Sequence, residues 1–202
     1  MIADFYGVLS LRNATLWVFL PSMLILACGA WVDQVRGTGA FCRAIKGGLV
    51  AGLIAAVAYD LFRLPFVFAR PLGLDGFIPS LNLFKVFPRF GAMILNQPLE
   101  QPVYSVAAHA AGWAYHFANG ATLGILYVAC VGNPARRHWG WAVLLAAGLE
   151  LGMLLTPYPA VFAIPVTPRF IGVTMAAHFV FGVTLGLWAR RLFANSGAKS
   201  GQ

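Results

Sequence analysis

Residues 47–67 read GGLVAGLIAAVAYDLFRLPFV, an apolar run in which only Asp60 and Arg63 are charged. A helix of about 20 such residues crosses the hydrocarbon core, where lipid cannot satisfy the free backbone groups of an open conformation. The rest of the chain is similar, because its 202 residues are 60% hydrophobic and 10% charged. Soluble domains are about 25% charged. We therefore expect an all-α, polytopic transmembrane helical bundle that forms one integral membrane domain over residues 1–202.

Four further runs reach a similar length, which gives five predicted spans. These spans lie at about residues 14–32, 47–67, 104–131, 139–158 and 170–189. The connection over residues 69–103 is predicted to be a long outer loop, although its segment 76–95 is apolar. Lys85, Pro88 and Arg89 interrupt that segment, and cations near the middle of the bilayer cost several kcal/mol. We expect segment 76–95 to be interfacial or re-entrant rather than a sixth span.

The positions of Lys and Arg set the orientation. One side of a five-span chain carries eight of them: Arg36, Arg43, Lys46, Arg136, Arg137, Arg190, Arg191 and Lys199. The other side carries six: Arg12, Arg63, Arg70, Lys85, Arg89 and Arg169. The positive-inside rule predicts a cytoplasmic C-terminus and an N-terminus outside. The net charge of +8 then reflects topology, and nucleic acid is not an expected partner.

The third and fifth spans share a sequence motif. Residues 116–126 read HFANGATLGIL and residues 178–188 read HFVFGVTLGLW, with His, Phe, Gly, Thr, Leu and Gly in one register. We predict a parallel duplication in which spans 2–3 and spans 4–5 each form a two-helix unit. Glycines four residues apart allow close helix packing in lipid. The predicted packing glycines are Gly48, Gly52, Gly120, Gly124, Gly182 and Gly186.

Ionisable residues inside spans are costly and mark candidate functional sites. The chain has five such residues: His109, His116, His178, Asp60 and Glu150. A helical rise of about 1.5 Å per residue places them in the outer half of the bundle, where Tyr115 and Asn119 flank His116. The cluster is compatible with a structural network, with a proton or small-ligand site, or with ligation of haem b or a transition metal by His116 and His178.

Several landmarks of the chain also occur together in a known family. They are the glycine-rich run 47–52, Arg63 and Pro65, the series His109, Trp113, His116 and Tyr127, then Trp139 and Trp141, Pro157 and Pro159, and His178 before Arg190 and Arg191. Over about residues 45–191 this order resembles the YagU-like inner-membrane proteins. The resemblance implies a bacterial inner-membrane location and an association with acid tolerance. The predicted N-terminal span departs from the four spans of that family.

Nucleophile elbows, P-loops, dinucleotide-binding glycine motifs and zinc-hydrolase motifs are absent from the sequence, which favours a non-enzymatic protein. The leading hypothesis is a polytopic membrane protein with a proton or small-ligand site in its His/carboxylate cluster. One alternative is an electron-transfer protein that binds haem or a metal through His116 and His178. Another is a structural subunit of a larger membrane complex, or a homo-oligomer, with the glycine faces as contact surfaces.

Overall fold

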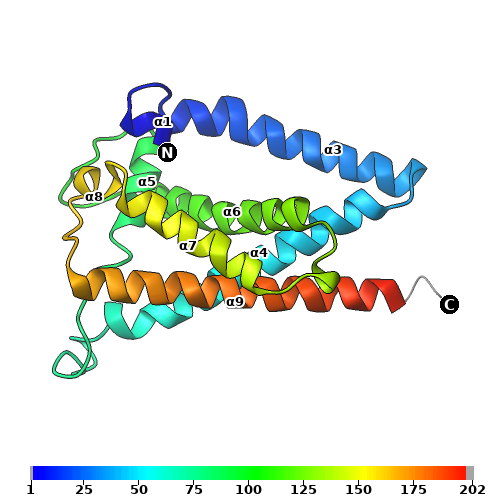
Figure 1. Ribbon diagram of the computed structural model, residues 1–202. Coiled ribbons are helices and arrows are strands. Elements are labelled where there is room, and N and C mark those ends of the chain that lie inside the picture. The colour runs from blue at the N-terminus through cyan, green and yellow to red at the C-terminus, as the bar shows by residue number, and fades with distance from the viewer. Residues whose placement is uncertain (1, 199–202) are drawn as a thin grey trace.

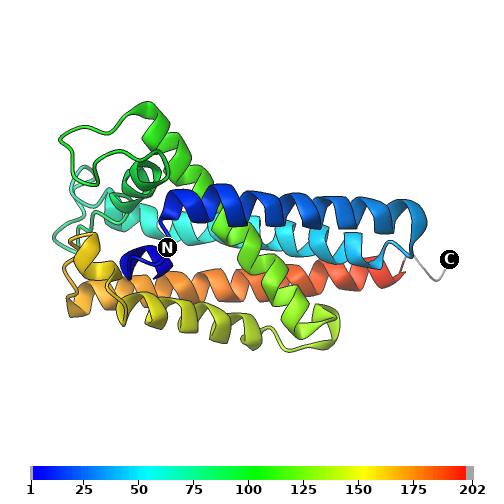
Figure 2. The same ribbon diagram turned by 90° about the horizontal axis from the view of Figure 1, so that it is seen from above.

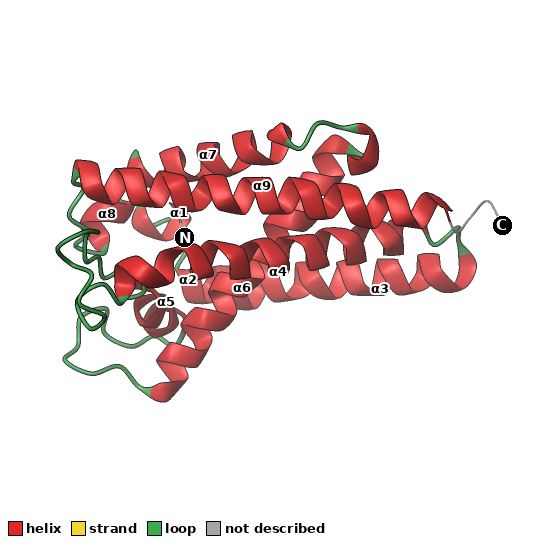
Figure 3. Ribbon diagram, turned by 90° about the horizontal axis from the view of Figure 1, so that it is seen from below, coloured by secondary structure: helices red, strands yellow, loops and turns green. Residues whose placement is uncertain are grey.

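The structure, a computed structural model, describes residues 2–198 and the side chains of residues 3–195. This part of the chain is all-α, 74% helical and without strands (Figures 1 and 3). Its helices are α1 (Ile2–Phe5), α2 (Leu11–Asn13), the π-helical turn η1 (Ala14–Phe19), α3 (Leu20–Arg36), α4 (Ala40–Val67), α5 (Val86–Ile94), α6 (Val106–Val131), the 3-10 turn η2 (Pro134–Arg136), α7 (Gly140–Leu154), α8 (Tyr158–Val161) and α9 (Pro168–Ala198).

Four helices in the described residues are long and apolar enough to cross a membrane. The first runs without interruption over Leu11–Arg36 and includes α2, η1 and α3; the others are α4, α6 and the Pro168–Asn195 part of α9. Three of these helices contain a predicted span and extend beyond it. The fourth, α6, begins two residues after its predicted span 104–131 begins and ends at the same residue. The prediction of an all-α chain with long apolar helices is therefore confirmed, and these helices are compatible with a membrane protein.

The bundle has two different ends. Helices α1, α5 and α8 and the segment 68–85 gather at one end, which we call the capped end (Figures 1 and 2). The other end holds the turn from α3 to α4 and the C-terminal end of α9. Gly39 makes that turn with a φ of 68°, a left-handed conformation in which glycine carries no steric penalty. Asp33 Oδ2 accepts from Cys42 N at 3.0 Å and so caps the start of α4.

Helix α7 is shorter than its predicted span of 139–158. It ends at Leu154 and contains 15 residues, so it is an apolar helix that is shorter than the four long ones. The chain turns at residues 155–157 and continues into α8, with Pro157 and Pro159 in this stretch. Proline lacks the amide that a continuing helix needs and clashes with the preceding turn, which explains the early end.

Packing is centred on α4 and α9. Helix α4 packs against α6 on one side and α9 on another, and α9 also packs along α7, whereas α6 and α7 barely touch. Glycines line two of these crossings. A Cβ at Gly48 would lie 2.8 Å from the carbonyl oxygen of Gly124, and a Cβ at Gly182 would lie 2.6 Å from Val143 Cα. These are the close backbone approaches that small residues permit.

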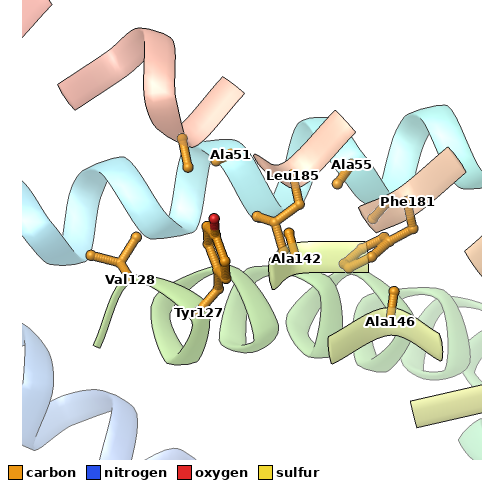
Figure 4. Packing of buried hydrophobic residues seen from close by; sticks show 10 residues of the cluster. Ala51, Ala55, Tyr127, Val128, Ala142, Ala146, Phe181 and Leu185 are labelled. Carbon is orange, nitrogen blue, oxygen red and sulfur yellow. The ribbon is translucent and has the colours of Figure 1, made fainter. Parts of the chain in front are cut away.

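The core between these helices is built largely from alanine. It contains Ala51, Ala55 and Ala56 of α4, Tyr127 and Val128 of α6, Ala142 and Ala146 of α7, and Phe181, Leu185 and Ala189 of α9 (Figure 4). Small side chains bring the helix backbones together and leave little free volume. The core lies on the side of the bundle away from the capped end.

Segment 76–95 contains the helix α5, which packs against the first half of α6. A Cβ at Gly112 would meet the backbone carbonyl of Phe87, so the two helices are in backbone contact there. Val86, Phe87 and Phe90 of α5 are buried in an aromatic cluster with Leu11 and Phe162. Lys85 and Arg89, the two cations in this apolar segment, donate hydrogen bonds to backbone carbonyls at the capped end. Lys85 donates to Ala163 O at 2.8 Å, and Arg89 donates to Phe162 O.

Candidate functional site

Asp60 lies two turns before the end of α4. Its carboxylate contacts two side chains, His116 and Arg63. Its Oδ2 lies 2.9 Å from His116 Nε2 on α6, and its Oδ1 lies 3.3 Å from Arg63 Nη1. The side chains of Asp60 and His116 are 12% and 16% exposed. A carboxylate only accepts, so His116 donates from Nε2, and a neutral imidazole then presents Nδ1 as an acceptor.

Arg63 follows Asp60 by three residues on the same helix face and is 4% exposed. Its Nη2 donates to Leu83 O at 2.6 Å. Its guanidinium carbon lies 4.6 Å from the ring centroid of Tyr59 and 5.0 Å from that of Phe84, which are cation–π distances. Arg63 Nε is buried and has no hydrogen-bond partner among the described residues. Such an unpaired buried donor is costly.

Glu150 of α7 and His178 of α9 form a second acid–histidine pair. His178 Nδ1 lies 3.2 Å from Glu150 Oε2 and 2.9 Å from the carbonyl oxygen of Thr174. The carbonyl can only accept, so Nδ1 carries a proton, and the Nε2 of a neutral ring is left as an acceptor. Both side chains are buried, at 6% and 3% exposure. A paired arrangement is what makes such burial tolerable.

Tyr59 connects the two pairs. Its ring centroid lies 4.9 Å from that of His178 and 6.0 Å from that of His116. Because Tyr59 also lies under the Arg63 guanidinium, one aromatic ring touches the cation and both histidines. The polar residues of α4, α6 and α9 therefore form one packed unit.

Two cavities meet at Tyr59 and Arg63, which line both. The first has a volume of about 170 Å³ and reaches from Glu150 to Ser80 and Lys85 at the capped end. The second has a volume of about 130 Å³ and is lined mainly by apolar and aromatic side chains. Its polar lining consists of Tyr59, Arg63, Tyr115, His116, Asn119, Tyr158 and His178. An apolar pocket with a few convergent polar groups is the usual form of a small-molecule site.

Tyr115 and Asn119 both line the second cavity, as their position beside His116 suggested. Tyr115 is half-buried and packs on Phe90, with ring centroids 5.2 Å apart. Asn119 is exposed and lies at the rim. Neither touches Asp60 or Glu150 in a described hydrogen bond.

The expectation that His109 joins the cluster is wrong. His109 is exposed and lies at a separate open hollow with Arg89, Glu100 and Tyr104, its ring 6.3 Å from that of Tyr104. It shares a helix face with His116, since seven residues make nearly two turns. At its level, however, α6 packs on α5, and His109 lies beside the α5 residues Pro88 and Arg89 rather than beside Asp60 of α4.

Sequence reasoning missed Tyr59 and the role of Arg63, which it used only for the orientation and as a landmark of the family resemblance. The signal for Arg63 was its spacing from Asp60, because oppositely charged residues three apart lie side by side on a helix. An apolar sequence gives no comparable signal for Tyr59, whose importance comes from a tertiary contact with α9.

Each of the two histidines has one ring nitrogen on a carboxylate, since His116 Nε2 faces Asp60 and His178 Nδ1 faces Glu150. Metal-ligating histidines have the same kind of partner on their non-ligating nitrogen, so ligation of haem or a metal by the two free nitrogens stays a prediction. In addition, Tyr59 packs against both rings. Among the described residues no three His, Cys, Asp or Glu side chains are placed to hold a metal ion together.

Comparisons with family models, with curated proteins and with solved structures give no match.

Proposed function

We propose that this protein is a five-span, non-enzymatic membrane protein that binds a small ligand in the paired cavities of its capped end. The observation that carries the proposal is the pair of cavities that meet at Tyr59 and Arg63, beside the two buried acid–histidine pairs. The ring nitrogens of His116 and His178 that do not face a carboxylate accept hydrogen bonds when the rings are neutral. The site therefore offers two acceptors in a largely apolar pocket.

Helix direction supports a fifth crossing by α7. Helix α6 ends away from the capped end, and α9 begins at the capped end, so α7 must bring the chain back between them (Figure 1). At about 1.5 Å per residue, the 15 residues of α7 span most of an apolar core, and the chain then continues into α8. With five crossings the positive-inside rule supports a capped end outside and a C-terminus in the cytoplasm. The YagU-like resemblance adds a bacterial inner-membrane location to this proposal.

The two acid–histidine pairs support an internal duplication. In each unit an acid on the first helix faces a histidine on the second: Asp60 with His116, and Glu150 with His178. The small residues Gly52 and Ala56 precede Asp60 by eight and four positions, as Ala142 and Ala146 precede Glu150. The packing is not symmetric throughout, because the contact between α4 and α9 has no counterpart of similar extent between α7 and α6.

The alanine-rich core favours binding over passage through the bundle. Below the site, the described side chains between α4, α6, α7 and α9 form a buried cluster of alanine, valine, leucine and aromatic residues. Neither cavity is lined by residues of the opposite end. A ligand that enters from the capped end would therefore be stopped by this buried cluster and could not pass through the bundle.

The proposal is tested by thermal unfolding of the protein in detergent with a small uncharged polar molecule, glycerol monoacetate. A ligand that binds only the folded protein raises its Tm in a concentration-dependent way. We expect such a rise in the wild type and its loss in Arg63→Lys, which keeps the charge but changes the shape of a side chain that lines both cavities. Arg70→Lys is the control, because Arg70 is exposed and lies outside both cavities. Equal shifts in wild type and Arg63→Lys would contradict the proposal.

A further inference from the structure

The open hollow beside His109 contains three basic side chains. Lys85 and Arg89 line it at the start of α5, and His109 lines it from the first turn of α6. The hollow has a volume of about 780 Å³. Of its lining residues, Asn82 and Lys85 also line the first cavity, and none lines the second. This place, which we call the basic hollow, is therefore separate from the two acid–histidine pairs.

Two of the basic side chains lie close together. Lys85 directly precedes α5, and Arg89 follows it by four residues, a spacing at which like charges on a helix are unfavourable. Burial, and then the charge of Arg89, lower the pKa of Lys85. The folded protein therefore holds two neighbouring positive charges, an arrangement that a bound anion would stabilise.

The hydrogen bonds of these two cations hold the side chains in place without neutralising them. Lys85 Nζ donates to Ala163 O at 2.8 Å, and Arg89 donates from Nη1 to Phe162 O and from Nε to the hydroxyl of Tyr104. All three acceptors are uncharged. An ammonium group has three N–H donors and a guanidinium group has five, so both cations retain donors for a ligand.

His109 adds a third donor and has an apolar neighbour. Its ring lies edge-on to that of Tyr104, and it has no hydrogen bond to any residue of the described part of the chain. An imidazole carries at least one N–H donor. Val106 precedes His109 by three residues on the same face of α6 and is 85% exposed. An exposed apolar side chain therefore borders the basic hollow.

The acidic residue of the lining indicates which anion fits. Glu100 is the one acid among the lining residues, yet its Oε1 lies 3.9 Å from Arg89 Nη2 and its side chain is 77% exposed. This distance is too long for a hydrogen bond, and an exposed ion pair contributes little. A carboxylate offers two oxygens, whereas a phosphate monoester offers three acceptor oxygens and a charge of about −1.5 to −2 at pH 7. Three basic groups therefore match a phosphate monoester better than a carboxylate.

We propose that the basic hollow binds a phosphate monoester whose oxygens accept hydrogen bonds from Lys85, Arg89 and His109. This site goes beyond the proposed function and does not depend on it, because Arg63 does not line the hollow. A soluble phosphate ester and the headgroup of a phosphatidic acid, whose acyl chains would pass beside Val106, share this chemistry. The experiment distinguishes these two sources. No reaction of the bound phosphate is implied.

The test follows acylation of the Lys85 amine in the full-length protein, in an uncharged detergent, with glycerol 3-phosphate as the probe. A bound phosphate stabilises the ammonium form and so slows acylation, which peptide mass spectrometry reads at Lys85. Lys46 is the internal reference, because it is exposed and lies in α4 near the opposite end of the bundle. We expect saturable slowing at Lys85 and none at Lys46. No slowing at Lys85, or equal slowing at both lysines, would overturn the proposal.

Variants test the individual contacts through the probe concentration that halves the Lys85 acylation rate. Arg89→Gln should raise this concentration about tenfold and His109→Ala about threefold, as for loss of one hydrogen bond to a charged ligand. Glu100→Gln should lower it about threefold, because a competing carboxylate is removed. Arg70→Gln, which is exposed and outside the hollow, should leave it unchanged.

Arg89 also bonds a backbone carbonyl, so His109→Ala is the variant that disturbs the fold least. An unchanged half-protecting concentration in either Arg89→Gln or His109→Ala would overturn the shared contact. A loss of protection in Arg63→Lys as large as that in Arg89→Gln would contradict a separate site. The Tm shift with glycerol monoacetate tests the proposed function independently, because that molecule carries no phosphate.

Matched probes separate the two sources of the phosphate. Dioctanoyl phosphatidic acid has the same phosphate monoester as glycerol 3-phosphate, and dioctanoylglycerol has the same chains without the phosphate. Protection at lower concentration by the phosphatidic acid would assign the site to a lipid headgroup, and equal or weaker protection would assign it to a soluble ester. Equal protection by dioctanoylglycerol would overturn the proposal. Dimethyl phosphate and acetate, each with two free oxygens, should protect less than glycerol 3-phosphate, and stronger protection by either would overturn the monoester class.

Discussion

The ring of Tyr59 lies 4.9 Å from the imidazole of His178, edge to face at 71°. Tyr59 belongs to α4 and His178 to α9, the two helices at the centre of the packing. This contact joins the Asp60–His116 pair and the Glu150–His178 pair in a single candidate site. A change in one pair can therefore reach the other through one aromatic ring.

The first prediction concerns the coupling between Asp60 and His116. Asp60→Asn and His116→Ala should each lower the free energy of unfolding, but the double variant should lose less than the sum, with a coupling of about 0.5–3 kcal/mol. The reason is that each single change leaves a buried polar partner unpaired. Unfolding by SDS titration in detergent micelles measures all three variants.

His109→Ala is the matched control, because this histidine lies on the same helix but is exposed. Its effect should stay within about 0.5 kcal/mol, as for most surface changes. Strict additivity of the Asp60 and His116 changes, or an equal loss in His109→Ala, would contradict the first prediction.

The second prediction concerns the crossing of α4 and α6. Gly52→Ala should lower the free energy of unfolding by about 1–3 kcal/mol, because the new Cβ would meet the backbone carbonyl of Gly120 and force the helices apart. Gly148→Ala on α7 is the control, since a Cβ there meets nothing within 4 Å. The control should be neutral or stabilising by up to about 1 kcal/mol from helix propensity. Similar losses of unfolding free energy in Gly52→Ala and Gly148→Ala would contradict the close crossing of α4 and α6.

The third prediction concerns Tyr127 in the alanine-rich core. Its side chain is 2% exposed, and its hydroxyl has no hydrogen-bond partner among the described residues. Removing a buried polar group that has no partner avoids its desolvation cost. Tyr127→Phe should therefore raise the free energy of unfolding by about 1 kcal/mol. A loss of stability in the same SDS titration would show that the hydroxyl is bonded.

The fourth prediction concerns Lys85 at the capped end. Burial, and then repulsion by the nearby Arg89, lower the pKa of Lys85 from its ordinary value of 10.5. The unfolded chain then binds more protons than the folded one between the two pKa values, so this residue makes stability rise with pH across that window. Arg89→Gln should move the Lys85 pKa upward, because one cause of the lowering is removed.

The Lys85 pKa can be followed by the pH dependence of amine acylation, read at the Lys85 peptide by mass spectrometry. The midpoint should lie at higher pH in Arg89→Gln than in the wild type. Arg70→Gln serves as the control, because Arg70 is exposed and its ion-pair partner is Asp75. A midpoint that falls or stays fixed in Arg89→Gln would count against this account.

Much of the architecture follows from the apolar runs alone. Length and composition predict the helices that become α3, α4, α6 and α9, because lipid permits few other backbone conformations. The run at 139–158 was predicted too long. Hydropathy does not register the turn before Pro157, since proline and its neighbours there are themselves mostly apolar.

Only part of the candidate site could be predicted from the sequence. Depth along each helix places His116 and His178 at similar levels, but it does not say which acid each one meets. It fails for His109, since depth takes no account of which neighbouring segment a helix face meets. The position of Tyr59 depends on the approach of α4 and α9, which is a tertiary property.

The packing of Phe5 on Phe162, with ring centroids 5.9 Å apart, has a consequence for biogenesis. Phe5 is made before α3, whereas its partner is made only after α7. The contact can therefore form only once the helices between the two residues have been made. Contacts between residues so far apart in sequence form late because loop closure is costly. The capped end of the bundle therefore closes late in synthesis.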